Sequence, residues 1–401
     1  MRTDTADTVA RGCRRRVQRD HVEQLSLGVV ARSRKPNEYR LPIHPAHLDR
    51  IDPSVRRSVF LEVGYGEHFG VADERLASLV GGLRSREQLV AECDVIVLPK
   101  PTAADLADLR AGQMLWGWPH CVQDETVTQL GIDRRLTLIA WEAMNHWATD
   151  GAYRVHVFHK NNELAGYCSV LHSMQLIGTT GSYGRRLRAA VISFGATARG
   201  AVMALNALGV SDVTVLTHRD VSAVASPIHG AQLLQFQRDG RESSRCVVLE
   251  DSGPKPLAEF LAEHAIVVNC VLQDTDAPLM FVTSKELELF APGTLFVDVS
   301  CDDGMGFEWA RPTSFEDPMR QVGESMHYYA VDHSPSYLWD SATWEISEAL
   351  LPYLGAVVAG PAAWDADQTI RRAIEIRDGR IQNPKILSFQ RRATEFPHNR
   401  L

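Results

Sequence analysis

The chain has 401 residues, of which 45% are hydrophobic, and a formal net charge of −8. One hydrophobic core rarely serves more than about 250–300 residues, so we expect two domains. The negative net charge leaves no broad basic surface and argues against a nucleic-acid partner. No apolar run approaches the roughly 20 residues that cross a bilayer, and residues 1–27 lack the apolar centre of a secretory signal, so we expect a cytoplasmic protein without membrane contact.

The seven cysteines are scattered, odd in number and nowhere spaced as Cys-x-x-Cys. This pattern argues against a disulfide framework and against a structural zinc site, and we expect no metal. Most of the cysteines are therefore expected to be small buried apolar residues.

The first half of the chain has the pattern of a parallel α/β sheet. Residues 1–26 are polar and carry an arginine cluster without apolar periodicity, which predicts a flexible, solvated arm. A long helix is expected at 164–176, as a bridge between domains. Before it, short buried strands are predicted at residues 27–31, 59–63, 93–101, 113–120 and 136–141.

The stretch at residues 188–219 has the order strand, glycine turn, helix and strand. Gly195 and Gly200 are expected to let the backbone approach a ligand, and the free N–H groups at the start of the helix suit a pyrophosphate. Ser193 stands where the usual fingerprint has its first glycine, so an ordinary strand-to-helix turn is the alternative. Further strands at 265–272 and 294–300 extend this unit into a doubly wound sheet.

The predicted fold class is α/β with two Rossmann-like domains, the second a doubly wound, parallel-sheet dinucleotide-binding domain inserted in the first. The substrate domain is expected at residues 27–162 and 327–401, and the nucleotide domain at 163–326. A strand near 328 leads to a helix at 342–354. The tail is expected to be helical at 368–377 and irregular at 390–401.

Lys100 and His120 each end a predicted strand. In open α/β sheets the ligand crevice lies outside the carboxyl ends of the strands, so the two side chains are expected to meet there. Singly, each is more often a structural residue. Together with Arg40, in the loop after the first strand, they offer two cations and a proton donor to the carboxylate and carbonyl of a 2-oxo acid.

The second strand of the nucleotide unit ends in Thr217, His218 and Arg219, where an NAD enzyme usually has an acidic residue for the ribose. A hydroxyl, an imidazole and a guanidinium suit a 2′-phosphate, which predicts NADPH (or NADP) rather than NADH as the cofactor. The alternative is that Arg219 is only solvated.

Six segments, taken together and in their order along the chain, indicate a family resemblance. They are Asn37-Glu-Tyr-Arg-Leu-Pro, Phe60-Leu-Glu-Val-Gly-Tyr-Gly-Glu, Arg110-Ala-Gly-Gln-Met-Leu-Trp-Gly-Trp-Pro-His, Leu164-Ala-Gly-Tyr-Cys-Ser-Val-Leu-His, Val297-Asp-Val-Ser-Cys-Asp-Asp-Gly and Val331-Asp-His-Ser-Pro-Ser. In these segments the chain resembles the alanine dehydrogenase and pyridine nucleotide transhydrogenase superfamily, and within it most of all the carboxyethylornithine synthases. The N-terminal arm and a loop insertion at 250–255 depart from that pattern.

The resemblance implies that Arg40 and Lys100 bind the carboxylate and carbonyl of pyruvate and that His120 acts as general acid or base. It also implies that Asp302 supports the reaction near the nicotinamide; without the resemblance, a loop-capping role for Asp302 is as plausible. Oligomers occur throughout the superfamily, so a homo-oligomer is expected.

Further contacts are expected around these residues. Asp303 and Asp332 are candidates to hold a second amino acid. The cofactor is expected to contact the glycine turn, the helix after it and the ends of neighbouring strands, at Ser193, Phe194, Gly195, Ala196, Thr197, Ala198, Gly200, Val271, Leu272 and Val299.

Several activities remain open at this stage. An opine-type synthase would join pyruvate reductively to the side-chain amine of ornithine or lysine. The resemblance favours this activity, as does the strand end at 217–219, which suits a 2′-phosphate. An alanine dehydrogenase would use ammonia instead. A non-catalytic NADP-binding sensor is a further alternative. The presence of all four predicted catalytic residues argues against it. A methyltransferase would need an acidic strand end that this chain lacks.

Overall fold

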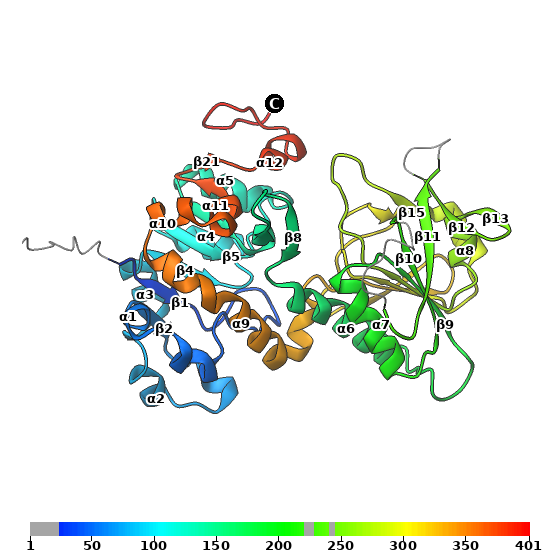
Figure 1. Cartoon of the computed structure of the whole chain (residues 1–401), viewed down its shortest axis with the longest axis horizontal. Coiled ribbons are helices and arrows are strands. Elements are labelled where there is room, and N and C mark those ends of the chain that lie inside the picture. The colour runs from blue at the N-terminus through cyan, green and yellow to red at the C-terminus, as the bar shows by residue number, and fades with distance from the viewer. Residues whose placement is uncertain (1–23, 220–227, 240–244) are drawn as a thin grey trace, which may run out of the picture.

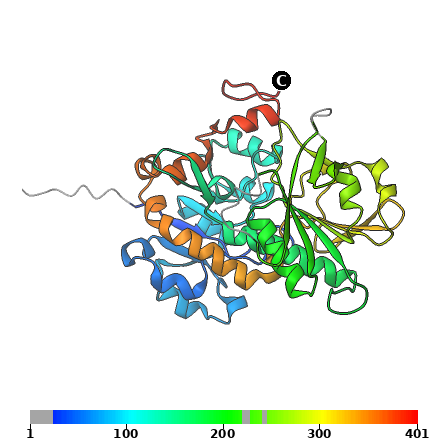
Figure 2. The same cartoon turned by 45° about the vertical axis from the view of Figure 1, so that its right-hand side comes forward.

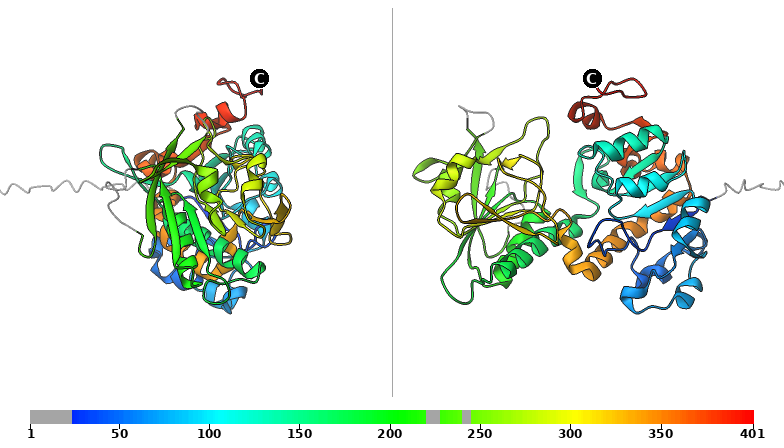
Figure 3. Two further views of the ribbon diagram at one scale, coloured as in Figure 1. Left: turned by 90° about the vertical axis from the view of Figure 1, so that its right-hand side faces the viewer. Right: turned by 180° about the vertical axis from the view of Figure 1, so that it is seen from behind.

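The computed structural model describes residues 24–219, 228–239 and 245–401. The expected N-terminal arm lies outside the described residues as far as residue 23. The described chain forms two α/β lobes that lie side by side, each built on one large sheet (Figure 1). Figures 2 and 3 show the two lobes from other sides, with the C-terminus near the first lobe.

The first lobe is built from both ends of the chain. Its strands are β1 (Leu27–Val29), β2 (Val59–Glu62), β3 (Gly82–Arg84), β4 (Val95–Leu98), β5 (Met114–Gly117), β6 (Thr137–Ala140), β20 (Ile374–Arg377) and β21 (Arg380–Ile381), with a separate hairpin of β7 (Asn145–Trp147) and β8 (Tyr153–His156). Its helices are α1 (Pro53–Arg56), α2 (Asp73–Ala77), α3 (Arg86–Glu92), α4 (Ala103–Asp108), α5 (Glu125–Asp133), α9 (Trp339–Val358), α10 (Pro361–Ala366), α11 (Gln368–Ala373) and α12 (Pro384–Phe389). Short 3-10 helices are η1 (Pro45–Arg50), η2 (Glu67–Phe69), η3 (Trp141–Ala143) and η6 (Ser334–Leu338).

The second lobe is built from the middle of the chain. The strands of its large sheet are β9 (Arg188–Ile192), β10 (Asp212–Thr217), β11 (Gln232–Arg238), β12 (Cys246–Glu250), β13 (Gly253–Pro256), β14 (Ile266–Asn269), β16 (Leu295–Asp298), β18 (Met319–Val322) and β19 (Met326–Tyr329). A small second sheet pairs β15 (Met280–Val282) with β17 (Gly306–Phe307). The helical elements are α6 (His159–Leu176), α7 (Ala196–Ala207), α8 (Leu257–Leu261) and the 3-10 helix η5 (Ser284–Leu289).

Both large sheets contain the strand order of a doubly wound fold. The first contains β3-β2-β1-β4-β5-β6 and the second β11-β10-β9-β14-β16-β19, with all these neighbours parallel. The order reverses between β1 and β4 and between β9 and β14, and ligands of open α/β sheets bind outside the strand ends at such points. The predicted fold class, two Rossmann-like domains with the second inserted in the first, is confirmed.

Apolar strand sequences explain why these sheets form where they do. All four residues of β4 and all four of β16 are buried. Parallel strands that are covered on both faces need such largely apolar sequence, and Asp298, the last residue of β16, is the polar exception in these two strands. The two strands therefore carry the residues that follow them to fixed positions at the edge of each sheet.

Three expectations about the chain are corrected. Residues 368–377 are helical only as far as Ala373, because Ile374 and Ile376 pair antiparallel with β6 and complete the first sheet. The expected boundary at residue 327 falls inside β19, which pairs with β16, so the second lobe continues at least to Tyr329. The expected loop insertion at 250–255 is largely a hairpin, in which Glu250 pairs with Gly253.

The expectations about membrane-spanning segments and about the cysteines can also be compared with the structure. Within the described ranges, no helix is long and apolar enough to cross a membrane. Six cysteines are unpaired and buried, as expected, at positions 93, 121, 168, 246, 270 and 301.

Helices α6 and α7 cross with almost no space between their backbones. A Cβ added to Gly200 would lie 1.7 Å from the carbonyl oxygen of Glu163, and one added to Gly166 would lie 1.9 Å from that of Thr197. Gly200 therefore permits the crossing of two helices, and the expected approach of a ligand at this residue is wrong.

The crossing leads to a stability prediction. Gly200→Ala must push α6 away from α7, and we expect it to lower the free energy of unfolding by roughly 1–3 kcal/mol. Gly195→Ala is the matched control, because the nearest atom to its added Cβ is 3.8 Å away. Urea unfolding of both variants measures the difference, and equal midpoints would contradict this interpretation.

Candidate functional site

Lys100 and His120 meet where two neighbouring strands end. Lys100 follows β4 and His120 follows β5, and the Lys100 Nζ lies 2.9 Å from the His120 Nε2. The side chain of Ser33 fixes the Lys100 backbone by donating to its carbonyl at 2.6 Å. The predicted meeting of these two side chains at the carboxyl ends of the strands is thus what the structure shows.

The protonation of this pair follows from its surroundings. Burial lowers the pKa of Lys100, although Asp332 partly opposes the shift. Burial and the ammonium of Lys100 hold the pKa of His120 well below its usual range. At neutral pH the imidazole is therefore uncharged, and Lys100 donates to its Nε2.

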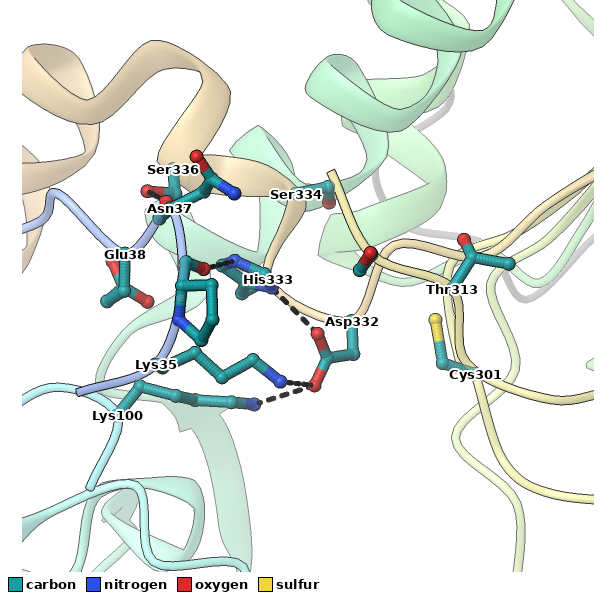
Figure 4. A network of polar contacts seen from close by, with 12 residues as sticks. Lys35, Asn37, Glu38, Lys100, Cys301, Thr313, Asp332, His333, Ser334 and Ser336 are labelled. Atoms are coloured by element: carbon teal, nitrogen blue, oxygen red, sulfur yellow. Dashed lines mark hydrogen bonds and ion pairs between the residues drawn. The ribbon is translucent and has the colours of Figure 1, made fainter. Parts of the chain in front are cut away.

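Asp332 joins this pair from the segment after β19. Its Oδ2 lies 2.6 Å from the Lys35 Nζ and 3.9 Å from the Lys100 Nζ (Figure 4). Its Oδ1 lies 2.7 Å from the Nδ1 of His333, whose Nε2 lies 3.0 Å from the carbonyl oxygen of Pro36. Burial alone would raise the pKa of Asp332, but His333 and the two lysines hold that pKa far below its usual range.

Helix α6 holds the Asp332 segment in place. Ser334 begins η6, and its hydroxyl donates to the carbonyl of Ala165 at 3.1 Å and accepts from the hydroxyl of Ser169 at 2.9 Å. Because α6 also packs against α7, one helix connects the Asp332 segment to the glycine turn of the second lobe. The expected role of this helix as a bridge is consistent with these contacts.

Arg40 lies nearby but is already paired. Its guanidinium donates to both carboxylate oxygens of Glu38, at 2.8 and 2.5 Å, and to the side chain of Asn161 at 3.2 Å. It lies 5.1 Å from the ring centroid of Trp118 and is 5% exposed. Although burial opposes the shift, Arg40 lowers the pKa of Glu38, so the pair is ionic. Arg40 is thus held by Glu38 in this structure, and its expected contact with a substrate carboxylate stays a prediction.

Asp302 and Asp303 have different surroundings. Burial raises the pKa of Asp302 to about 6. Asp303 lies 3.7 Å from Arg311, and the side chains of both are about three-quarters exposed, at 76% and 74%. The expected contact of the exposed Asp303 side chain with a substrate stays a prediction.

Two candidate residues, His120 and Ser193, and the residue before Asp302 adopt backbone conformations that favour glycine. His120 has a φ of 49°, Cys301 of 57° and Ser193 of 118°. Such conformations cost about 1–3 kcal/mol each and persist where the surrounding structure holds them. Cys301 is held by its N–H, which donates to the Asp298 side chain at 3.3 Å, so the turn before Asp302 is a fixed one.

The glycine turn fits a dinucleotide in one respect. Gly195 precedes α7, and within residues 24–219, 228–239 and 245–401 no side chain caps the start of this 12-residue helix. Uncapped N–H groups at a helix start, together with the helix dipole, suit a pyrophosphate. The Ser193 hydroxyl accepts from the Gly195 N–H at 3.3 Å, so the serine that replaces glycine supports the turn from within.

The other predicted cofactor residues divide into two groups. Ala198 is fully buried in the core of the second lobe and Thr217 is 1% exposed, with its hydroxyl accepting from the N–H of Arg219 at 3.1 Å. Direct contact with a cofactor is not supported for these two, because packing or the backbone already engages them. Residues at or near the surface of this edge are Ser193, Phe194, Gly195, Ala196, Thr197, His218, Arg219, Val271, Leu272 and Val299.

Leu272 stands out among these residues. This residue lies in the segment after β14, at the point where the strand order of the second sheet reverses. Leu272 is 93% exposed. An exposed leucine at a ligand-binding edge provides an apolar surface for a flat ring.

Sequence reasoning missed several residues of the site. Lys35 lies in the same loop as Arg40, and His333 lies next to Asp332, so both were within segments already singled out. Glu142 follows β6, and its Oε1 accepts from the N–H of His120 at 2.6 Å. The rule that functional side chains follow parallel strands would have found Glu142 as it found Lys100.

Two models of known protein families match this chain. The profile of the alanine dehydrogenase/PNT N-terminal domain matches residues 28–165, and that of the C-terminal domain matches residues 165–384. The chain belongs to the alanine dehydrogenase/PNT family. Proteins of this family are oxidoreductases that bind pyridine nucleotides, which agrees with the two Rossmann-like lobes and the uncapped helix.

Among the relatives are two kinds of enzyme. An alanine dehydrogenase of Mycobacterium tuberculosis is 26% identical over 337 residues, which cover 80% of this chain and 84% of that protein. An N(5)-(carboxyethyl)ornithine synthase of Clostridium botulinum is 22% identical over 329 residues, which cover 78% and 89%. These identities support the alanine dehydrogenase/PNT family and leave the substrate open.

Solved structures agree with the fold. An L-alanine dehydrogenase superposes with a TM-score of 0.68 at 20% identity and covers 91% of this chain and 99% of its own. A transhydrogenase from Sinorhizobium meliloti has a TM-score of 0.64 at 19% identity and covers 88% and 99%.

Proposed function

We propose that this alanine dehydrogenase/PNT family protein reductively condenses pyruvate, or a similar 2-oxo acid, with the side-chain amine of ornithine or lysine, using NADPH. The product is an N-(1-carboxyethyl) amino acid. The observation that supports it most is the cluster of Lys35, Lys100, His120 and Asp332, which lies at the strand ends of the first lobe and includes an acid from the segment that leaves the second. The family resemblance also supports a cytoplasmic homo-oligomer as part of this proposal.

Lysines bind the 2-oxo acid in this proposal. The Nζ atoms of Lys35 and Lys100 both contact the Asp332 carboxylate, so the same two ammonium groups suit the carboxylate of a substrate. Lys35 is therefore a cation of this cluster in addition to Arg40 and Lys100, which the sequence singled out.

His120 moves the protons. Its neutral imidazole accepts a proton from the substrate ammonium, which frees the amine to attack the carbonyl carbon. After the attack, a proton passes from the added nitrogen to the former carbonyl oxygen, which becomes a hydroxyl. The imidazolium then returns its proton to this hydroxyl, which leaves as water while the C–N double bond forms. Burial and the nearby Lys100, at 2.9 Å from the Nε2, lower the pKa of His120 and keep the imidazole uncharged before the substrate enters.

The second lobe supplies the cofactor site. Bound NADPH supplies the hydride that reduces the imine. Gly195 and the first turn of α7 would hold the pyrophosphate, and Arg219 would hold the 2′-phosphate. Asp302, with its pKa raised to about 6, lies after β16 and would stabilise the cationic nitrogen of the imine when ionised.

An alanine dehydrogenase activity with ammonia is the second candidate. It is favoured by the alanine dehydrogenases among the relatives, which match this chain at least as well as the carboxyethylornithine synthases do. The Asp332 carboxylate of this cluster, together with the role proposed for Asp302, favours the larger amine, because an amino acid brings a second cationic group.

The deciding experiment compares amines. NADPH oxidation is followed with pyruvate and, in turn, ornithine, lysine and ammonia at equal concentration. The proposal expects turnover with an amino acid well above that with ammonia. Turnover with ammonia alone would establish the second candidate instead, and NADPH binding without turnover on any of the three would favour a sensor.

A further inference from the structure

The last part of the chain packs against the loop that follows His120. Helix α12 ends at Phe389, and the next residue, Gln390, is 2% exposed. The Gln390 Nε2 donates to the carbonyl oxygen of Cys121 at 2.7 Å and to that of Val122 at 3.1 Å. The tail of the chain therefore holds the backbone of the two residues that directly follow His120.

The orientation of the Gln390 amide is fixed from its other side. Arg392 is 4% exposed, and its Nε donates to the Gln390 Oε1 at 2.7 Å. Its Nη1 donates to the side-chain oxygen of Gln129, on α5, at 2.8 Å, where the tail lies beside that helix (Figure 1). Because a guanidinium is only a donor, the amide oxygen faces Arg392, and the Nε2 is left for the two carbonyls.

These contacts matter because the backbone at His120 has a conformation that favours glycine. With a φ of 49°, the residue needs neighbours that hold it in place. Its N–H donates to the Oε1 of Glu142 at 2.6 Å, and the carbonyl of Cys121 also accepts from the hydroxyl of Thr128 at 2.6 Å. Gln390 is the member of this set that the tail contributes.

The tail lies beyond the part of the chain that the family models match. The profile of the C-terminal domain ends at residue 384, before Gln390 and Arg392. His398 closes the segment on itself, because its Nε2 accepts from the N–H of Ile381 at 3.1 Å and its carbonyl accepts from Arg392 at 3.3 Å. The family resemblance therefore does not account for this support of the His120 loop.

We propose that Gln390 is a positioning residue for His120, and that residues 390–398 form an element that keeps the imidazole beside Lys100. By holding the carbonyls of Cys121 and Val122, the amide keeps the turn in which His120 lies. This turn places the His120 Nε2 at 2.9 Å from the Lys100 Nζ. Gln390 acts through the backbone and does not touch the substrate.

The first test needs no substrate. NMR titration of the free full-length protein, labelled at its histidines, follows His120, whose signal is identified by its loss in His120→Ala. In Gln390→Met the side chain keeps its length but cannot donate, so the turn should loosen and the imidazole should move into water and away from Lys100. Since burial and Lys100 lower the pKa of His120 in the wild type, that pKa should rise toward its ordinary value in the variant.

The substitution leaves the charges around His120 as they are, because glutamine and methionine are both neutral. Besides Lys100, the charged or titratable groups that face the imidazole are Lys35, Arg40, Asp332 and Glu142. None of them belongs to residues 390–398. A rise in the pKa of His120 therefore reports a change in the position of the imidazole.

Gln113 provides the matched control. It is 3% exposed, and its Nε2 donates to the carbonyls of Val90 and Cys93 at 2.9 and 2.8 Å. It directly precedes β5, at the end of the strand opposite to His120. Gln113→Met should leave the pKa of His120 unchanged. An unchanged pKa in Gln390→Met, or an equal rise in both variants, would overturn the proposal.

A milder variant keeps the test decisive if Gln390→Met does not fold. Gln390→Asn retains the amide but shortens the side chain by one methylene, so the amide cannot reach the Cys121 carbonyl while Arg392 holds its oxygen. The pKa of His120 should rise in this variant too. A folded Gln390→Asn protein with the wild-type pKa of His120 contradicts the proposal.

Turnover gives a second readout, which rests on the proposed function. Gln390→Met should lower kcat by roughly tenfold to a hundredfold, because small displacements of a catalytic group are costly, while the Kd for NADPH stays unchanged. The acid limb of kcat/KM for pyruvate should move to higher pH together with the pKa of the free protein. A loss of kcat/KM that is equal at every pH would indicate a structural role and contradict positioning.

The two readouts separate this inference from the proposed reaction. If the pKa of His120 rises in Gln390→Met while the wild type turns over pyruvate with no amine, the proposed function fails and the positioning of His120 by the tail stands. If the wild type turns over and the pKa does not move, the positioning role fails alone.

Discussion

His120→Ala is expected to lower kcat by roughly 10²–10⁴-fold while the Kd for NADPH stays unchanged. The imidazole is the group that accepts and returns the proton, and its Nε2 lies 2.9 Å from Lys100 at the strand ends of the first lobe. The predicted cofactor site belongs to the second lobe, so removal of the imidazole should leave it intact. Steady-state turnover and fluorescence titration with NADPH measure the two quantities separately.

A second histidine provides the control for this substitution. His146 is exposed in the hairpin of β7 and β8, and His146→Ala should keep full activity. A His120→Ala enzyme with wild-type kcat would remove the histidine from the proposed chemistry. Loss of NADPH binding in the same variant would show that the substitution disturbs the fold.

Arg219→Ala is expected to raise KM for NADPH by roughly tenfold to a hundredfold and to leave KM for NADH unchanged. A hydrogen bond to a charged group contributes about 1.5–3 kcal/mol, and about 1.4 kcal/mol corresponds to a tenfold change in affinity. Arg219 is exposed at the end of β10, and its N–H is fixed by Thr217, so its side chain is available to a 2′-phosphate.

The exposed Arg154 of β8 is the matched arginine for this comparison, and Arg154→Ala should leave both constants as they are. If the wild type prefers NADH at equal concentrations, the NADPH assignment is wrong whatever Arg219 contributes. If Arg219→Ala affects both cofactors equally, the guanidinium serves the shared part of the dinucleotide.

The parallel sheets could be predicted because their central strands are largely apolar. Apolar runs such as Val95–Leu98 and Leu295–Val297 are buried in the folded chain, and the rule for strand ends then placed Lys100 beside His120. Local sequence was sufficient for these elements, since each strand carries its own signal.

The tail was predicted less well because its conformation depends on a distant partner. Ile374 and Ile376 form a strand only because the edge of β6 is free to pair with them, and no nearby residue signals that edge. The contact of Gln390 with the loop after His120 depends on a distant partner in the same way.

Pairing between side chains was the other part that sequence could not reveal. Arg40 and Glu38 are two residues apart, yet whether the guanidinium faces its neighbour or a ligand depends on the packing of Trp118 and Asn161 around it. The glycine at position 200 likewise predicts that another group comes close to the backbone, but it does not tell which group. In the structure that group is helix α6.

The product itself tests the central claim most directly. The purified protein is incubated with pyruvate, NADPH and ornithine or lysine, and the mixture is analysed by mass spectrometry. The account predicts a compound whose mass is that of the amino acid plus pyruvate, less one water and plus two hydrogens. Formation of alanine from added ammonia, with no such adduct from either amino acid, would contradict it.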